Sequence, residues 1–218
     1  MFITQLFTLI RKDFLLEWRQ KHTLFGVMLY VGCTVFVLYM MAGQPERRIW
    51  NALFWVAQLF VTVNTVAKSF LQERETRMRY YFTLVKPAQY ILGKMVYSLV
   101  LMAVMMLISL LLFQLLLGNP IQQPWVFAGV ALLGTSSLTL LFTFLSAIAA
   151  QARQNAALMA ILGFPIAIPL LMILSQLSLG TVSDVVQEGM GQLAWVLAGM
   201  DALIIALAVI LFPFLWKE

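Results

Sequence analysis

The sequence predicts an all-α integral membrane protein with six transmembrane helices, folded as a single domain over residues 1–218. Of its 218 residues, 62% are hydrophobic and 11% are charged, whereas soluble domains have about 45–50% apolar and about 25% charged residues. No charged side chain occurs between Met95 and Ala152. Uncharged apolar sequence of this length is stable only within a lipid bilayer. The soluble globular and disordered classes of protein are therefore excluded.

Six stretches supply the ~20 mostly apolar residues that a helix needs to cross a hydrocarbon core of ~30 Å. Turn-forming residues at 118–124 divide the long uncharged run into two helices, and polar residues at 150–155 end the second of them. Tryptophans 50, 125, 195 and 216 lie near the ends of spans, as interfacial aromatic residues do. The expected spans are about 24–42, 50–67, 95–117, 125–150, 156–177 and 192–216.

The distribution of cations predicts the orientation. With the N-terminus inside, twelve of the 14 Lys and Arg residues fall on the inner side, and only Arg47 and Arg48 fall on the outer side. Cytoplasmic loops of membrane proteins carry such an excess of positive charge. Both termini are therefore expected to face the cytoplasm.

Residues 1–23 have the pattern of an amphipathic helix that lies in the membrane interface. Apolar residues recur at helical spacing, and basic residues beside them suit anionic lipid headgroups. The segment is either a simple membrane anchor or an elbow helix whose Asp13 and Glu17 contact a partner protein. The apolar positions are Ile3, Leu6, Phe7, Ile10, Phe14 and Trp18.

The inner loop at 68–94 is the longest segment expected outside the membrane. The pairs Glu73/Arg77 and Glu75/Arg79 have the i,i+4 spacing that stabilises a helix, and Tyr81 belongs to an aromatic run that follows them. A short helix with charges and exposed aromatics is suited to docking a partner. The alternative is a basic loop that only sets the topology.

Three features stand out within the spans. Pro165 and Pro169 each remove a helical N–H group, so the fifth span is expected to be kinked or broken, either for packing alone or at a point along a permeation route. Asp201 is the one acid inside a predicted span, and it could face an outer vestibule or pair with another helix. Small and hydroxyl residues at 134–137 favour close helix contact in the fourth span.

Sequence signatures of catalysis are missing. The chain has no phosphate-binding loop and no G-x-S-x-G, H-E-x-x-H or C-x-x-C motif. A single cysteine, Cys33, and a single histidine, His22, give no ligand set for a metal ion. We therefore expect no catalytic residue, no bound metal or cofactor and no nucleic-acid partner for this chain, with membrane lipids around it.

Four segments resemble a known family, the B subunit of the haem exporter of cytochrome c maturation, CcmB. The resemblance extends over the whole chain, including its size and its six spans. The segments that carry it are Lys12-Asp-Phe-Leu-Leu-Glu-Trp-Arg19, the 70–94 loop that ends in Leu92-Gly-Lys94, Leu133-Gly-Thr135, and Phe164-Pro-x3-Pro-Leu-Leu171.

The resemblance implies an ABC-2-like permease subunit of the bacterial inner membrane that couples ATP hydrolysis by a separate ATPase to haem export, or to release of the haem-loaded periplasmic chaperone. It implies three kinds of partner: the ATPase, a haem-handling membrane subunit and a small accessory subunit. Six spans are half of the usual ABC core, so a homodimer is expected. The implied ATPase-coupling residues are Asp13, Glu17, Glu73, Arg74, Arg77, Arg79 and Tyr81, and the translocation or gating candidates are Pro165, Pro169 and Asp201.

Two other functions fit the same sequence. One is an ABC-type permease that exports a lipid, a polysaccharide or a drug, for which the docking loop would look the same. The other is a membrane enzyme or scaffold that works without an ATPase.

Overall fold

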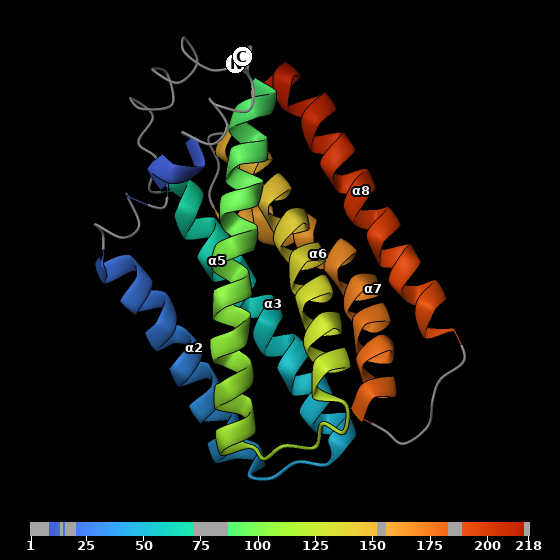
Figure 1. The fold of residues 1–218 in the computed structure, drawn as a ribbon. Helices are drawn as coiled ribbons and strands as arrows, with labels where there is room; N and C mark the ends of the chain where they lie inside the picture. Colours follow the sequence, from blue (N-terminus) through green and yellow to red (C-terminus); the bar gives the residue numbers. More distant parts are fainter. Residues whose placement is uncertain are drawn as a thin grey trace.

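A computed structural model describes residues 9–13, 15, 21–71, 87–151, 156–182 and 189–215. Within these ranges the chain forms six long helices and no strand (Figure 1). Each of the six helices is long and apolar enough to cross a membrane. The predicted fold class is confirmed. The helices are α2 (Lys21–Ala42), α3 (Arg47–Leu71), α5 (Pro87–Leu116), α6 (Pro124–Gln151), α7 (Ala156–Val182) and α8 (Met190–Leu215).

Successive helices run in opposite directions through the bundle (Figure 1). Helix α6 lies at its centre and contacts α3, α5, α7 and α8, while α2 packs at the edge against α3 and α5. Helices α2, α5 and α7 begin at one end of the bundle, here called the Lys94 end, where α3, α6 and α8 finish. The opposite end, where 43–46 and 117–123 connect helices, is called the Trp50 end.

Small and hydroxyl residues let α6 occupy this central position. A Cβ atom on Gly134 would lie 2.5 Å from Leu174 of α7 and closer still to the Trp55 ring of α3, so the backbones approach closely there. Buried hydroxyls on α6 donate to carbonyls of their own helix, as Thr139 does to Thr135 O at 2.6 Å. The close contact predicted for residues 134–137 is confirmed.

The Trp50 end is filled by aromatic rings from three helices. Trp50 and Phe54 of α3 stack with ring centroids 5.7 Å apart, and Phe113 of α5 and Phe127 of α6 pack edge-on against Trp50. The Trp50 indole N–H donates to Gly118 O at 3.1 Å. Trp50 lies near the end of α3, as predicted, but it is fully buried, because rings from three helices cover it.

One helix boundary differs clearly from the expected span. Helix α5 begins at Pro87 and is 30 residues long, whereas the span was expected to begin at residue 95. The charge of Lys94 suggested the end of the span, but Lys94 lies inside the helix and is buried.

Candidate functional site

A buried ion pair joins the N-terminal segment to α5 at the Lys94 end. Residues 9–13 are helical, and Lys94 Nζ lies 3.5 Å from Asp13 Oδ2. The side chains of Lys94 and Asp13 are only 5% and 7% exposed. Lys12 lies 3.1 Å from the other carboxylate oxygen, and the Lys94 ammonium lies 5.7 Å from the centre of the Tyr97 ring.

This pairing explains how a lysine can be buried in α5. Removing a charge from water costs several kcal/mol per ion, and the interior tolerates it only beside an opposite charge. Asp13 supplies that charge from 81 positions earlier in the chain. The 9–13 segment is therefore held against α5, and the two are expected to move together.

The same end of the bundle links α5 to α8. The Tyr90 ring of α5 stacks on Phe212 of α8, with centroids 5.9 Å apart and planes within 12°. Both side chains are almost fully buried. A displacement of α5 at the Lys94 end would therefore also move α8.

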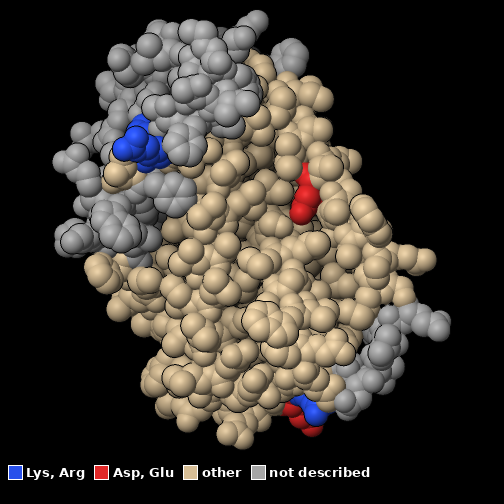
Figure 2. Space-filling model, viewed as in Figure 1, with Lys and Arg blue, Asp and Glu red and all other residues tan. Residues whose placement is uncertain are grey.

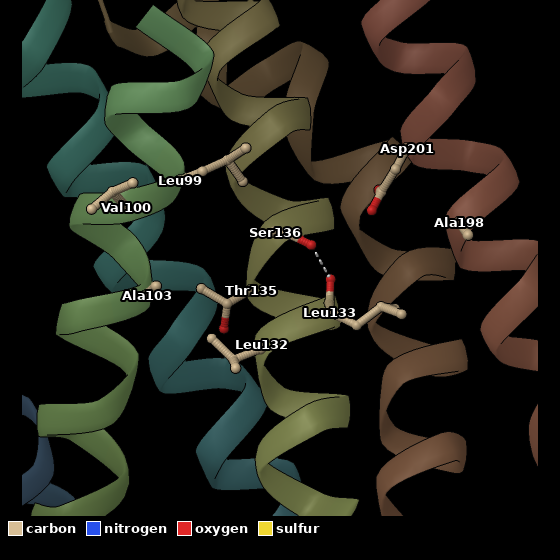
Figure 3. A pocket seen from close by; sticks show the side chains of 9 residues that line it. All are labelled: Leu99, Val100, Ala103, Leu132, Leu133, Thr135, Ser136, Ala198 and Asp201. Carbon is tan, nitrogen blue, oxygen red and sulfur yellow. Dashed lines mark hydrogen bonds between the residues drawn. The ribbon is translucent and has the colours of Figure 1, made fainter. Parts of the chain in front are cut away.

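Away from that contact, α5 and α8 border an open groove of about 520 Å³ whose floor is α6 (Figure 3). Charged side chains in Figure 2 gather near the two ends of the molecule, and an acidic patch lies on the otherwise uncharged face beside α8. The residues that line the groove are Leu99, Val100 and Ala103 of α5, Leu132, Leu133, Thr135 and Ser136 of α6, and Ala198 and Asp201 of α8.

Asp201 lies beside the hydroxyls of Ser136 and Ser137. Both hydroxyls donate to Leu133 O, at 2.6 and 3.1 Å, and both are also within hydrogen-bonding reach of the Asp201 carboxylate. The Oδ1 atom of Asp201 is buried without a hydrogen-bond partner, and so is the hydroxyl of Thr135 in the same groove. Of the two positions expected for Asp201, the structure shows the one beside another helix, α6. A role of Asp201 in translocation stays a prediction.

The two prolines of α7 lie on its exposed surface. Helix α7 continues without a break through Pro165 and Pro169, so the expected break does not occur. Its buried face is made of smaller and apolar residues, such as Gly163, which lies against the Phe142 ring of α6. Neither proline lines the groove, and their role in translocation stays a prediction.

The remaining coupling candidates lie outside the described residues. They are Glu17, Glu73, Arg74, Arg77, Arg79 and Tyr81. Asp13 is described, and its partners in the structure are Lys94 and Lys12 of the same chain. A contact between these residues and an ATPase stays a prediction.

A polar network between α3 and α7 was not predicted. The Asn51 amide donates to Ser175 O at 3.0 Å, and Ser178 Oγ lies 2.7 Å from both Asn51 Oδ1 and Trp55 Nε1. Near the same end, Arg47 donates to Val182 O at 3.4 Å. An asparagine one residue into a predicted span was the available signal, because amides in spans commonly bond across helices.

The contacts at these sites are suited to binding and to transmitting movement between helices. In the described part of the chain, no group of three or more His, Cys, Asp or Glu residues could hold a metal ion. The arrangement consists of a buried ion pair, a ring contact and a groove with unpaired polar atoms.

The sequence matches the family model described as CcmB protein over residues 4–215. The comparison with curated proteins gave no match. The family match spans nearly the whole chain, and the six membrane-crossing helices fit a multi-pass inner-membrane permease of the cytochrome c maturation system. The chain belongs to the CcmB family.

Proposed function

We propose that this chain is the permease subunit that couples ATP hydrolysis by a separate ATPase to haem export, or to release of the haem-loaded periplasmic chaperone. The observation that carries the proposal is the family match over residues 4–215. The chain itself catalyses no reaction, and haem is the cargo of the complex. A haem-handling membrane subunit, a small accessory subunit and a second copy of this chain complete the assembly.

In this proposal the Lys94 end faces the cytoplasm. The excess of basic residues assigned to the inner side supports that orientation. The ATPase would then meet two segments, the N-terminal helix and the loop at 72–86, where the paired charges Glu73/Arg77 lie.

Both segments converge on α5. The 72–86 loop continues directly into Pro87, the first residue of α5, and the N-terminal helix is attached to α5 by the Asp13–Lys94 pair. Closure of the ATPase on ATP binding would displace α5, and the Tyr90–Phe212 contact would pass this movement to α8. Because α5 and α8 border the groove, the displacement would change its width.

Substitution of the docking loop tests the proposal. The triple variant Glu73→Ala, Arg77→Ala, Tyr81→Ala should lose most of the ATPase from the purified complex and abolish cytochrome c maturation, while the permease remains inserted. If ATP drives release of the chaperone, haem-loaded chaperone should remain on the complex. The matched control is Gln122→Ala, Gln123→Ala, which changes two exposed side chains at the Trp50 end. Undiminished recovery of the ATPase would show that the loop only sets topology.

An exporter of a lipid, a polysaccharide or a drug would have the same docking loop. Deletion of the gene separates the two functions. Loss of cytochrome c with an unchanged envelope supports the proposal, and an envelope defect with normal cytochrome c contradicts it.

A further inference from the structure

Helix α7 exposes an amide side chain at a depth where acyl chains would surround it. Gln176 is exposed, and its amide has no hydrogen-bond partner among the described residues. Its depth follows from Arg47, whose charge belongs at the edge of the hydrocarbon and which donates to Val182 O. Gln176 precedes Val182 by six residues, so it lies about 9 Å deeper along the helix. A glutamine side chain does not reach water from there, and hydrocarbon does not replace the missing bonds.

Gln176 belongs to a stripe that has the spacing of a helix–helix seam. Pro165, Pro169, Met172 and Gln176, here called the α7 stripe, follow one another at intervals of 4, 3 and 4 residues, and all four are exposed. This alternation keeps one face of a helix against a single partner helix. Each proline also removes an N–H group that would bond to a carbonyl one turn earlier, so the stripe includes backbone acceptors that lipid cannot satisfy.

A groove beside the stripe has room for side chains of a second helix. This α3–α7 groove has a volume of about 330 Å³, and Ala52 and Val56 of α3 line it together with Met172 and Gln176 of α7. The ridge of α3 that begins with Ala52 and Val56 continues at the same spacing to a second amide, the half-buried Asn64. The face that α3 and α7 share therefore combines a groove, a seam and amide side chains.

The chemistry of Gln176 favours a second copy of this chain as the occupant. Two copies that insert in the same orientation are related by a twofold axis along the membrane normal, so a residue near the axis meets itself at the same depth. An amide both donates and accepts, so two Gln176 side chains satisfy each other. A helix of another protein would need a polar side chain placed independently at this depth, and an acyl chain has none. An ionised Asp201, by contrast, only accepts and could not pair with itself.

We propose that two copies of this chain pack along their α7 stripes, with Gln176 hydrogen-bonded to the partner's Gln176 and side chains of each copy in the α3–α7 groove of the other. A polar residue at one position of an otherwise apolar seam fixes the register of the two helices. The inference rests on the proposed function for the presence of a second copy, and it adds which face forms the contact and which residue aligns it.

Disulfide crosslinking tests the contact while Gln176 is retained. The chain is expressed in a Cys33→Ser background with the ATPase and the two proposed membrane subunits, and membranes are treated with a mild oxidant. Met172→Cys should give a covalent dimer of this chain, because residues that face each other across a seam come within the short Cα–Cα distance that a disulfide needs. The matched control is Leu107→Cys, which changes an exposed residue of α5 and should give at least about tenfold less dimer.

A charge substitution tests the pairing of Gln176 with itself. Two differently tagged copies, both with Met172→Cys, are co-expressed, and crosslinks between the two tags are counted. Gln176→Arg in both copies should lower these crosslinks by at least about tenfold, because an Arg keeps its charge and like charges repel strongly away from water. Gln176→Arg in one copy and Gln176→Glu in the other should restore them. Gln192→Arg, at an exposed glutamine near the start of α8, should have no effect.

Three outcomes would overturn the proposal: no dimer from Met172→Cys, equal yields from Met172→Cys and Leu107→Cys, or mixed crosslinks that the Arg/Glu combination does not restore. Failure of the proposed function is a separate result. In that case the unmodified chain would not recover the ATPase, whereas crosslinking at 172 would still report whether two copies meet along α7.

Discussion

Neutralising one member of the Asp13–Lys94 pair should release the N-terminal segment from α5. Both side chains are more than nine-tenths buried, and removal of one partner from a buried pair costs about 3–5 kcal/mol. Lys12 remains beside Asp13 when Lys94 is changed, so the lower end, about 3 kcal/mol, is the better expectation. At 1.4 kcal/mol for each factor of ten, the population of the released segment should rise roughly a hundredfold.

Labelling of a cysteine in the segment measures this release. In a Cys33→Ser, Ile10→Cys background, the thiol replaces a half-buried side chain, and its reaction rate follows the opening of the segment. Asp13→Asn and Lys94→Met should each raise the rate by up to about a hundredfold. Arg11→Cys is the matched control, because position 11 is already exposed and should react at nearly the same rate in every variant.

The double variant Asp13→Asn, Lys94→Met decides whether the two residues act as a pair. It leaves no buried charge, so its labelling rate should fall at least tenfold below the product of the two single effects. Rates that multiply would show that Asp13 and Lys94 contribute independently, and the proposed attachment of the segment to α5 would then be wrong.

Three further predictions concern topology, packing and haem. Cysteines introduced as Gln122→Cys and Val186→Cys should react with a membrane-impermeant reagent in intact cells, and Thr76→Cys and Gln154→Cys should not; labelling at 76 would contradict the orientation. Gly134→Ala should lower the free energy of unfolding by about 1–3 kcal/mol, because the added Cβ meets Leu174 and Trp55. The control Gly129→Ala has open space around it and should be neutral or stabilising by up to about 1 kcal/mol. Thermal unfolding in detergent measures both variants. The purified chain should bind no stoichiometric haem, and His22→Ala should leave cytochrome c maturation largely intact, since axial ligation needs a suitably placed His, Met, Cys or Tyr; a one-to-one haem spectrum that His22→Ala removes would refute this.

Hydropathy was sufficient to predict the six spans, because the need to satisfy backbone groups in hydrocarbon permits little but helices. The small residues at 134–137 also predicted close packing correctly, since the absence of large side chains is a local property. Both inferences depend only on residues that are near one another in the sequence.

The errors arose where distant residues decide the outcome. Lys94 was taken as the end of its span, whereas α5 begins at Pro87 and buries Lys94 beside Asp13, a partner that lies in a different predicted segment. For Trp50 the sequence indicated a position near the end of a span, but not that Phe113 and Phe127 from two other helices enclose it. For Asp201 the sequence showed an unusual carboxyl, but only the assembled helices reveal a groove with unpaired polar atoms.

The length of α5 has a consequence for the membrane itself. Its 30 residues extend about 45 Å at 1.5 Å per residue, some 15 Å more than the ~30 Å hydrocarbon core. A tilt of about 48° would be needed to contain it, well beyond the average of ~20°. The first turns of α5 therefore project into the headgroup region, and Lys94 lies about 10 Å from the start of the helix. A thicker bilayer would surround the ion pair with acyl chains, so lipid composition is expected to influence how firmly the N-terminal segment is attached.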